Sequence, residues 1–304
     1  MKEKLLVADI GGSKTRIRIY TPDGTVIEER VSVGVASAND STEPLPLLES
    51  ALSEVENKEH VVVAAVNLGG KNVTQISTSI KKIFPCVNIR VFRESEGIAA
   101  YEIGKEYGAD IILMAGTGAI AVGRSANGFV TVGGWGANIG DRGSGYDIGL
   151  QAISMSLASL DKNEPLSDMT KQICGCTEPL ALTQSPESFA KARDKIRQRI
   201  APLDRQHIAS FAKTVAEFAK KGDKSALKIL DTAGKKLAEL VLDAERTLGC
   251  ARRSVVITGG LIHSVKFWKS SFEKALCDYE IHYVEDGLLR GAFLVAKDMY
   301  EKEI

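Results

Sequence analysis

The fold is decided by residues 5–33, which read LLVADIGGSKTRIRIYTPDGTVIEERVSV. An apolar run meets a glycine-rich turn at 11–13, and residues 16–20 then alternate between charged and apolar side chains, which is typical of a half-buried strand. The turn at 22–24 contains Asp-Gly, a strong hairpin signal between two such runs. We therefore expect a meander of three strands joined by tight turns.

The same plan returns at residues 111–134, IILMAGTGAIAVGRSANGFVTVGG, with a glycine turn at 116–118 and an Asn-Gly turn at 127–128. Two copies of one three-stranded unit predict a duplicated lobe. After each unit the pattern changes to alternating helices and strands, which predicts sheets covered by helices and hence an α/β protein. The length agrees, because 304 residues exceed the usual size of a single domain.

The remaining elements follow from hydrophobic periodicity. We expect further strands at 61–66, 87–92, 254–260 and 280–284. We expect helices at 72–83, 95–107, 146–160, 206–221, 223–248, 266–277 and 288–300. Several prolines interrupt residues 160–205, so an irregular helical insertion is expected there.

Charge and composition exclude several classes of function. Lys plus Arg equals Asp plus Glu at 39 each, so no excess positive charge is available to neutralise nucleic acid or an anionic membrane surface. The apolar run before the first glycines is too short for a secretion signal or a membrane span. We expect a soluble, cytoplasmic protein whose partners are small molecules, and a homodimer stays open.

Cysteine and histidine give no strong metal or redox signal. Of the five cysteines, only Cys174 and Cys176 lie close together, and no C-x-x-C occurs. We expect two reduced thiols in a loop, with a redox or metal role as the alternative. The four histidines are not spaced as metal ligands.

The two glycine turns are candidate phosphate sites, because glycine lets backbone N–H groups approach a phosphate closely and adopt positive φ. The first contains Gly11 and Gly12 and follows Asp9, whose carboxylate at a strand's end could hold Mg²⁺ directly or through water. Two such turns at equivalent places in a repeat would grip one triphosphate; the alternative is that each is only a β-turn. The chain has neither the P-loop sequence nor the dinucleotide-binding fingerprint.

Two further glycine segments are candidate binding sites. Gly259 and Gly260 end an apolar strand and leave room for a flat group such as adenine. Residues 133–145, GGWGANIGDRGSG, are far richer in glycine than a core requires. Trp135 in this segment can offer an apolar face to a sugar ring, and Asp141 can accept hydrogen bonds from paired hydroxyls. A purely structural loop is the alternative.

Phosphoryl transfer to an alcohol also needs a carboxylate that takes the hydroxyl proton. Glu94 and Glu96 follow the strand expected at 87–92. A carboxylate at the carboxyl end of a strand in an α/β sheet commonly faces the ligand. Glu94 is therefore the candidate base, with a solvated surface pair as the alternative.

Together these segments resemble one known family. The ordered set is DIGGSKT (9–15), NLGGKN (67–72), AGTG (115–118), GGWGANIGDRGSG (133–145), IASFAKTVAEFAKKGD (208–223) and ITGG (257–260). It is similar to the N-acetylglucosamine kinase branch of the BadF/BadG/BcrA/BcrD ATPases and covers nearly the whole chain. The resemblance implies two ribonuclease-H-like, actin-like lobes that close over ATP and a sugar. It also implies transfer of the γ-phosphoryl group to the sugar 6-hydroxyl, assisted by Mg²⁺.

The resemblance also assigns individual residues by position. Ser13 and Thr117 would contact the ATP phosphates, and Asp9 would lie near the metal. The rest of the nucleotide site would consist of Gly11, Gly12, Ala209, Gly259, Gly260 and Ser264. The sugar site would consist of Asn39, Ala119, Gly134, Trp135, Gly136, Ala137 and Asp141. The last helix would return to the first lobe, which gives lobes of 1–106 plus 286–304 and of 107–285 with the helical insertion.

The chain departs from the family pattern at three places. The catalytic position of the family is normally Asp, and here it is Glu94, which is longer by one methylene. Ala119 and Ile120 follow the second turn, where the family often has polar residues. Arg142 follows Asp141 where an acidic residue is common. These differences bear on the identity of the sugar more than on the fold.

Three functions are compatible with these patterns. The first is an ATP-dependent kinase acting on N-acetylglucosamine, or on glucosamine, N-acetylmuramic acid or glucose. The second is an ATP-driven activator of the BadF/BadG type, in which cysteines near glycine loops hold an iron–sulfur cluster between subunits. The third is an actin- or chaperone-like ATPase. ATP turnover that depends on added sugar would separate the first function from the other two.

Overall fold

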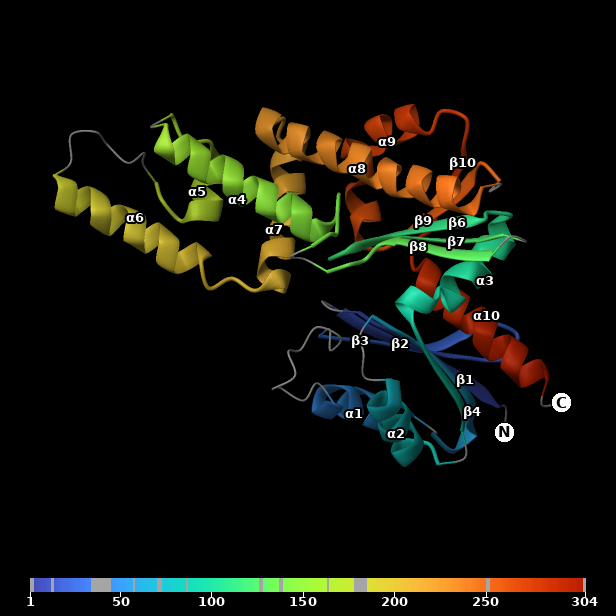
Figure 1. The fold of residues 1–304 in the computed structure, drawn as a ribbon. Helices are drawn as coiled ribbons and strands as arrows, with labels where there is room; N and C mark the ends of the chain where they lie inside the picture. Colours follow the sequence, from blue (N-terminus) through green and yellow to red (C-terminus); the bar gives the residue numbers. More distant parts are fainter. Residues whose placement is uncertain are drawn as a thin grey trace.

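Two five-stranded sheets form the centres of two lobes (Figure 1). The structure, a computed structural model, describes residues 3–11, 14–33, 45–56, 58–69, 73–85, 87–125, 128–136, 139–162, 164–177, 185–249 and 252–302. The first sheet contains β1 (Lys4–Ile10), β2 (Lys14–Tyr20), β3 (Val26–Val33), β4 (Val61–Leu68) and β5 (Asn88–Arg93). The second contains β6 (Ile111–Ala115), β7 (Ala119–Ser125), β8 (Gly128–Gly133), β9 (Ser254–Thr258) and β10 (Glu280–Tyr283).

The two sheets share one topology. The strand order is β3-β2-β1-β4-β5 in the first sheet and β8-β7-β6-β9-β10 in the second. In both, the first three strands pair antiparallel, and the other two run parallel to the strand that opens the lobe. The predicted duplication and the α/β class with two lobes are therefore confirmed.

Helices connect and cover the strands. The α-helices are α1 (Leu45–Ser53), α2 (Val73–Ile83), α3 (Ile98–Tyr107), α4 (Gly145–Asp161), α5 (Asp168–Cys174), α6 (Pro186–Ile200), α7 (Arg205–Lys220), α8 (Lys224–Leu248), α9 (Lys269–Ala275) and α10 (Gly287–Glu301). Short 3-10 helices are η1 (Lys58–His60), η2 (Glu94–Glu96) and η3 (Gly260–Phe267). The helices expected between 72 and 83, 146 and 160, 206 and 248, and 288 and 300 are all present within a few residues.

Three details differ from the expected elements. Helix α1 was not predicted. The helix expected at 95–107 is divided, because Gly97 has a left-handed conformation (φ 64°) and separates η2 from α3. The helix expected at 266–277 is also divided: η3 ends at Phe267, and the short α9 follows Trp268.

The last helix, α10, lies with α3 between the two sheets (Figure 1). Its residues Leu289 and Ala292 share a buried cluster with Leu5 and Val7 of β1. Helix α3 belongs to both interfaces, because Ile103 packs with apolar residues of the second sheet. We propose to keep the lobe boundaries at 1–106 plus 286–304 and at 107–285.

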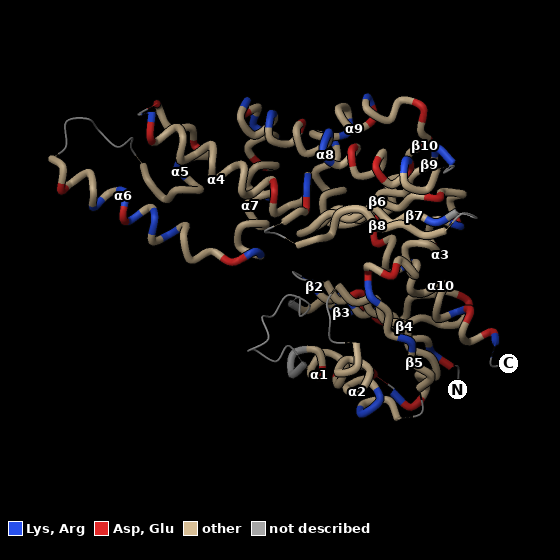
Figure 2. The backbone as a smooth tube through the Cα atoms, viewed as in Figure 1, with Lys and Arg blue, Asp and Glu red and all other residues tan. Residues whose placement is uncertain are grey.

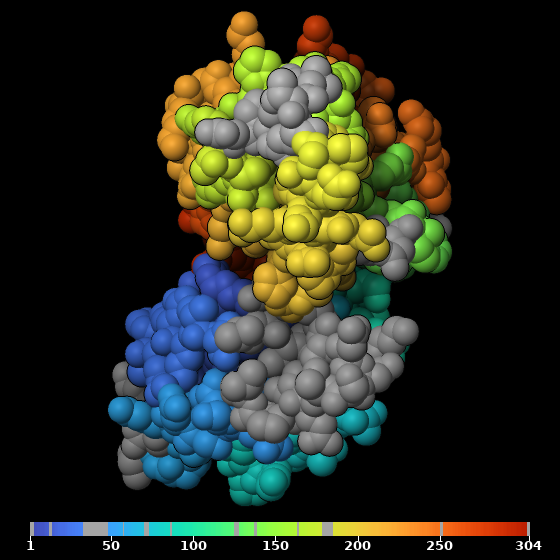
Figure 3. Space-filling model, turned by 90° about the vertical axis from the view of Figure 1, so that its left-hand side faces the viewer, coloured from blue at the N-terminus to red at the C-terminus, as the bar shows by residue number. Residues whose placement is uncertain are grey.

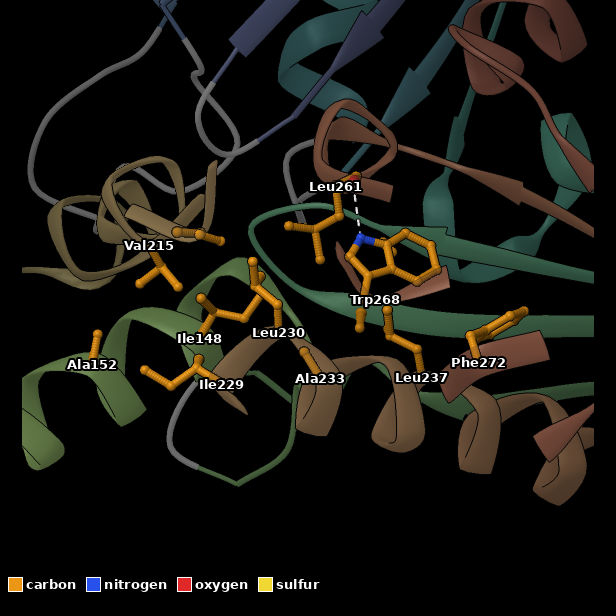
Figure 4. Packing of buried hydrophobic residues seen from close by; sticks show 14 of the residues in the cluster. Ile148, Ala152, Val215, Ile229, Leu230, Ala233, Leu237, Leu261, Trp268 and Phe272 are labelled. Atoms are coloured by element: carbon orange, nitrogen blue, oxygen red, sulfur yellow. Dashed lines mark hydrogen bonds between the residues drawn. The ribbon is translucent and has the colours of Figure 1, made fainter. Parts of the chain in front are cut away.

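A buried aromatic pair anchors the core of the second lobe. Trp268 and Phe272 are fully buried, and their rings meet edge to face with centroids 5.7 Å apart. The indole Nε1 donates a hydrogen bond to the Leu261 carbonyl at 3.2 Å (Figure 4). Each such burial contributes about 1.5–3 kcal/mol. The pair therefore fixes η3 and α9 against α8, next to the strand end at Thr258.

Helices α4 and α7 cross closely enough that one position requires glycine. A β-carbon placed on Gly149 would lie 1.9 Å from the carbonyl oxygen of Ile208. Because the obstructing atom is backbone, the substitution Gly149→Ala must separate the helices. We expect a loss of about 1–3 kcal/mol from this strain, which outweighs the gain of up to about 1 kcal/mol in helix propensity.

Thermal unfolding followed by circular dichroism checks this expectation. Ser154→Ala, on the exposed side of the same helix, serves as the control and should melt close to the unaltered protein. An unchanged or higher melting temperature for Gly149→Ala would show that α4 and α7 can separate there without cost.

The outer surface carries mixed charge. Basic and acidic residues are interspersed over both lobes in Figure 2. Turned by 90°, the space-filling view shows one lobe above the other, with α6 on the face of the second lobe (Figure 3). None of the helices in the described ranges is long and apolar enough to cross a membrane.

Candidate active site between the two lobes

Three strands of the first sheet end at a common edge and carry polar side chains there. Because β1, β4 and β5 are parallel neighbours, their carboxyl ends bring Asp9, Asn67 and Glu94 together. Asn67 Nδ2 donates a hydrogen bond to Asp9 Oδ1 at 2.8 Å. A β-carbon on Gly69 would lie 3.2 Å from Glu94 Oε2 and 3.6 Å from the Cα of Gly11. Glu94 therefore lies beside the first glycine turn, as its position after β5 predicted.

The first glycine turn closes through its backbone. The Gly11 N–H donates to the carbonyl of Lys14 at 3.0 Å, and the Gly69 N–H donates to the carbonyl of Ile10 at 2.8 Å. Gly12 and Ser13, predicted to bind phosphate, lie outside the described residues. The turn is thus held at both sides, at the end of β1.

The second glycine turn occupies the equivalent place in the second lobe. Its ends are joined by a hydrogen bond from the Gly116 N–H to the Gly118 carbonyl at 2.9 Å. The first turn of α4 packs on it, because the N–H groups of Gly145 and Tyr146 donate to the carbonyls of Gly116 and Thr117 at 2.8 and 3.1 Å. These contacts fix Thr117 between β6 and the start of α4.

Asp141 is buried beside the second turn. Its side chain is 1% exposed, and Oδ2 accepts a hydrogen bond from Arg205 Nη2 at 2.7 Å. The Ala119 N–H approaches Oδ1 at 3.4 Å. Asp141 has a positive φ of 61°, a conformation that is uncommon outside glycine and that costs free energy. A strained, buried carboxylate with its oxygens oriented by donors is typical of a ligand-binding position.

The two lobes meet at Glu94. Burial raises the pKa of the half-buried Glu94 carboxyl to about 7, and Asp9 of the first lobe raises it as well. Arg205 of the second lobe opposes this shift, while Asp141 adds to it. The lobes are in contact beside this residue, because the Thr131 hydroxyl of β8 donates to the Ser95 carbonyl at 3.3 Å. The predicted base, the predicted metal position and the predicted sugar ligand Asp141 therefore face the same region between the lobes, within range of one another's charge.

The pKa of Asp9 is raised, as is that of Glu94. Burial raises its pKa, and the hydrogen bond from Asn67 and the charge of Arg16 oppose the shift. Two carboxylates with raised pKa values at one strand edge form a site that favours a cation. The described residues contain no group of three His, Cys, Asp or Glu side chains that could hold a metal ion.

The tryptophan segment presents its ring to solvent. Trp135 is 74% exposed, in contrast to a core tryptophan. Gly134 and Gly136 on either side of it have positive φ values of 68° and 96°, and the Gly134 N–H donates to the Ala119 carbonyl at 2.9 Å. Trp135 is therefore held at the end of β8 with a free aromatic face. Ala137 and Asn39, two other predicted sugar ligands, lie outside the described residues.

The predicted adenine position adjoins the second glycine turn. Gly259 has φ 105°, and a β-carbon there would lie 2.4 Å from the Ala115 carbonyl oxygen, so only glycine fits. Gly260 has open space around its Cα, and its N–H group lies 3.9 Å from where a β-carbon of Gly116 would be. The carbonyl of Ala209 lies 3.5 Å from the corresponding point on Gly145. Gly259 and Gly260 thus lie beside Ala115 and Gly116, and Ala209 lies beside Gly145 at the start of α4.

Ser264, also predicted to bind the nucleotide, makes its hydrogen bond within η3 and not with the second glycine turn. It is 8% exposed, and its hydroxyl donates to the Leu261 carbonyl within η3 at 3.0 Å. The two neighbouring cysteines are likewise apart from the site. Cys174 is buried at the end of α5, not in a loop, and its thiol pKa is raised to about 12 by burial and by Cys176.

Three site residues escaped prediction. Arg205 opens α7, and Asp204 before it is a recognisable helix cap, but nothing local indicates a partner 64 residues away. Asn67 and Gly69 lie in a segment that contributed to the family resemblance without being given a role. Their position at the end of a buried strand could have indicated that they lie at the site. Arg142, in contrast, turns away from the site and pairs with Asp243 of α8 at 2.9 Å.

Comparison with known proteins agrees with this arrangement. The N-acetylmuramic acid/N-acetylglucosamine kinase of Clostridium acetobutylicum is 30% identical over 284 residues, which cover 88% of each chain. The N-acetyl-D-glucosamine kinase of Dictyostelium discoideum is 25% identical over 285 residues, which cover 86% of each. A solved structure from Chromobacterium violaceum, of a candidate N-acetylglucosamine kinase, has a TM-score of 0.67 at 20% identity and covers 97% of this chain and 99% of that chain.

The match extends to the level of a family. The sequence profile of the BadF/BadG/BcrA/BcrD ATPases matches residues 8–293, which include both glycine turns, Glu94, Asp141 and Arg205. This chain therefore belongs to the BadF/BadG/BcrA/BcrD ATPase family.

Proposed function

We propose that this protein is an ATP-dependent sugar kinase that phosphorylates N-acetylglucosamine at the 6-hydroxyl. The observation that carries the proposal is the meeting of Glu94, a carboxyl with a pKa near 7, with Asp9 of its own lobe and Asp141 of the other. A base at this pKa, between a glycine turn from each lobe, suits transfer of a phosphoryl group to a hydroxyl. The names of the two curated relatives support the sugar.

The acceptor would bind on the side of the second lobe. Asp141 would accept hydrogen bonds from sugar hydroxyls, since each of its oxygens retains capacity beyond its present donor. Trp135 would cover one face of the ring, and the backbone at Gly134, Gly136 and Ala119 would line the rest. Glu94 would then take the proton of the 6-hydroxyl as that oxygen bonds to the γ-phosphorus and ADP leaves.

The nucleotide would bind along the two glycine turns. Backbone N–H groups at 11–13 and 116–118 would hold the phosphates, and the adenine would lie against Gly259 and Gly260. Asp9 fits Mg²⁺, because Asn67 fixes its orientation, burial raises its pKa, and Mg²⁺ commonly takes one or two carboxylates together with substrate phosphates. The metal, when bound, would neutralise negative charge on the phosphate oxygens. All of these residues belong to one chain, so the proposal does not require a homodimer.

The activator alternative needs cysteines at a glycine loop. In this chain Cys174 ends α5 and Cys176 follows it; α5 packs on α4, α6 and α7, and Cys174 is buried. That placement gives no observation in favour of a cluster shared between subunits at the nucleotide site. We therefore put forward the kinase alone.

The decisive experiment measures ADP release with ATP and Mg²⁺ in the presence of N-acetylglucosamine, N-acetylmuramic acid, glucosamine or glucose. We expect the highest kcat/KM with N-acetylglucosamine and a phosphate ester at its 6-position by NMR. Turnover that is the same with and without sugar would contradict the proposal and favour the activator or the actin-like ATPase. A preference for N-acetylmuramic acid would keep the kinase and change its acceptor.

The pKa of Glu94 predicts how activity depends on pH. A base must be ionised, and this carboxyl loses its proton near pH 7 instead of near its ordinary value of 4.5. We expect kcat/KM to rise with pH through about 7, with roughly a tenth of the activity left one pH unit below. A pH series at saturating ATP and low sugar measures this. A profile that stays flat from pH 5 to pH 8 would exclude Glu94 as the base.

A further inference from the structure

Arg205 is a cation whose position is fixed from two sides. Asp204 caps α7 by accepting from the His207 N–H at 2.9 Å, which sets the helix start. The close crossing at Gly149 and Ile208 then sets the helix against α4. Because Arg205 is the first residue of α7, its guanidinium extends from a rigid support toward the second glycine turn.

The turn itself is shaped to admit this side chain. A β-carbon on Gly118 would lie 2.7 Å from Arg205 Nη2 and 3.0 Å from Asp141 Oδ1. Any other residue at 118 would therefore push the two charged groups away from the turn. The absence of a side chain at this position makes room for an ion pair directly on the turn.

The ion pair with Arg205 compensates the burial of the Asp141 carboxylate. Its side chain is 1% exposed, while that of Arg205 is 39% exposed, so the carboxylate is the partner that has lost its water. An unpaired buried carboxylate is strongly unfavourable. Among the described residues, the salt bridge of Asp141 is to Arg205 alone, and its positive φ adds strain that contacts must offset.

We propose that Arg205 is a positioning residue for the acceptor: its guanidinium holds the Asp141 carboxylate in the buried, oriented state that accepts the sugar hydroxyls. This inference rests on the proposed function and adds to it the residue that decides acceptor affinity without belonging to the sugar ligands. The pair also explains why the second lobe presents Asp141 toward Glu94 of the first, since Arg205 lies near both carboxylates.

The chain provides a matched control. Arg142 adjoins Asp141 in sequence, but it is exposed and pairs with Glu239 and Asp243 on α8. Arg142→Met removes the same charge one residue from Asp141 and leaves the buried pair intact. Arg205→Met removes the pair, and Arg205→Lys keeps the charge with a shorter reach.

The experiment measures binding of N-acetylglucosamine by calorimetry, together with KM and kcat and with melting temperatures. We expect Arg205→Met to weaken sugar binding about 10- to 100-fold, with the loss mainly in KM for sugar and with the Kd for a non-hydrolysable ATP analogue unchanged. Arg205→Lys should recover part of the loss, and Arg142→Met should bind as the unaltered protein does. In an Asp141→Asn background, Arg205→Met should cause little further loss, because it acts through Asp141.

Two results would overturn the inference. One is unchanged sugar affinity in a folded Arg205→Met variant; if that variant fails to fold, unchanged affinity in both Arg205→Lys and the double variant leads to the same conclusion. The other is full additivity of the Arg205 and Asp141 substitutions. Failure of the unaltered protein to bind any of the sugars would overturn the proposed function, and this inference with it.

Discussion

Replacing Glu94 by Gln is expected to abolish sugar-dependent ATP turnover and to leave ATP binding nearly intact. Glutamine keeps the size of the side chain but cannot take a proton. General-base catalysis contributes about 10²- to 10⁴-fold, so kcat should fall by at least that range. The substitution also removes a carboxyl that is costly to ionise beside Asp9 and Asp141, so the folded state should not be weakened by the loss of charge.

Single-turnover kinetics and binding of an ATP analogue measure the two parts of this expectation. Glu96→Gln is the matched control, because Glu96 is exposed on the same short 3-10 helix. It should keep the activity of the unaltered protein. Glu94→Asp tests reach, since it shortens the side chain by one methylene and should give intermediate activity. An unchanged turnover number in Glu94→Gln would remove this residue from the base role.

The second large effect is expected for Asp141→Asn. Asparagine tolerates the left-handed conformation at φ 61° and keeps one oxygen, so the local fold should persist. The oxygen that binds Arg205, however, loses its charge. Hydrogen bonds to a charged group contribute about 1.5–3 kcal/mol each. With two sugar hydroxyls and Arg205 affected together, affinity for sugar should fall by about 10²-fold or more.

Calorimetric titration with sugar, in the absence of nucleotide, measures this loss. Asp243→Asn serves as the control, since Asp243 forms an exposed pair with Arg142 on the outer side of α8. That variant should bind sugar normally. Sugar affinity retained in Asp141→Asn would mean that the acceptor lies elsewhere in the cleft and that the buried ion pair serves the fold alone.

Much of the fold could be predicted because its signals are local. The Asp-Gly and Asn-Gly turns and the alternation in β2 predicted both meanders, and the antiparallel pairing of successive strands confirms them. Long amphipathic helices such as α8 can be predicted from the spacing of their apolar residues. Glu94 and Asp141 could be proposed as site residues because a carboxylate at a strand end and a carboxylate in a glycine-rich segment are both unusual.

The parts that failed depend on contacts between distant residues. Helix α1 has only nine residues, and packing of Leu48 and Leu52 in the buried cluster of the first lobe stabilises it. The division between η3 and α9 follows from the burial of Trp268, which only the tertiary packing with α8 determines. Arg205 is an ordinary basic residue at a helix start until the chain brings Asp141 to it. Sequence patterns indicate the conformation that a segment prefers by itself, whereas these features depend on its contacts with distant parts of the chain.

Helix α10 has a consequence for how the protein is made. A ribosome produces the residues of the first sheet early and α10 only after the whole second lobe. Until then the face of the sheet that contains Leu5, Val7 and Val63 lacks the cover of Leu289 and Ala292. The half that is synthesised first is thus completed last, and the nascent chain exposes an apolar surface throughout most of its translation.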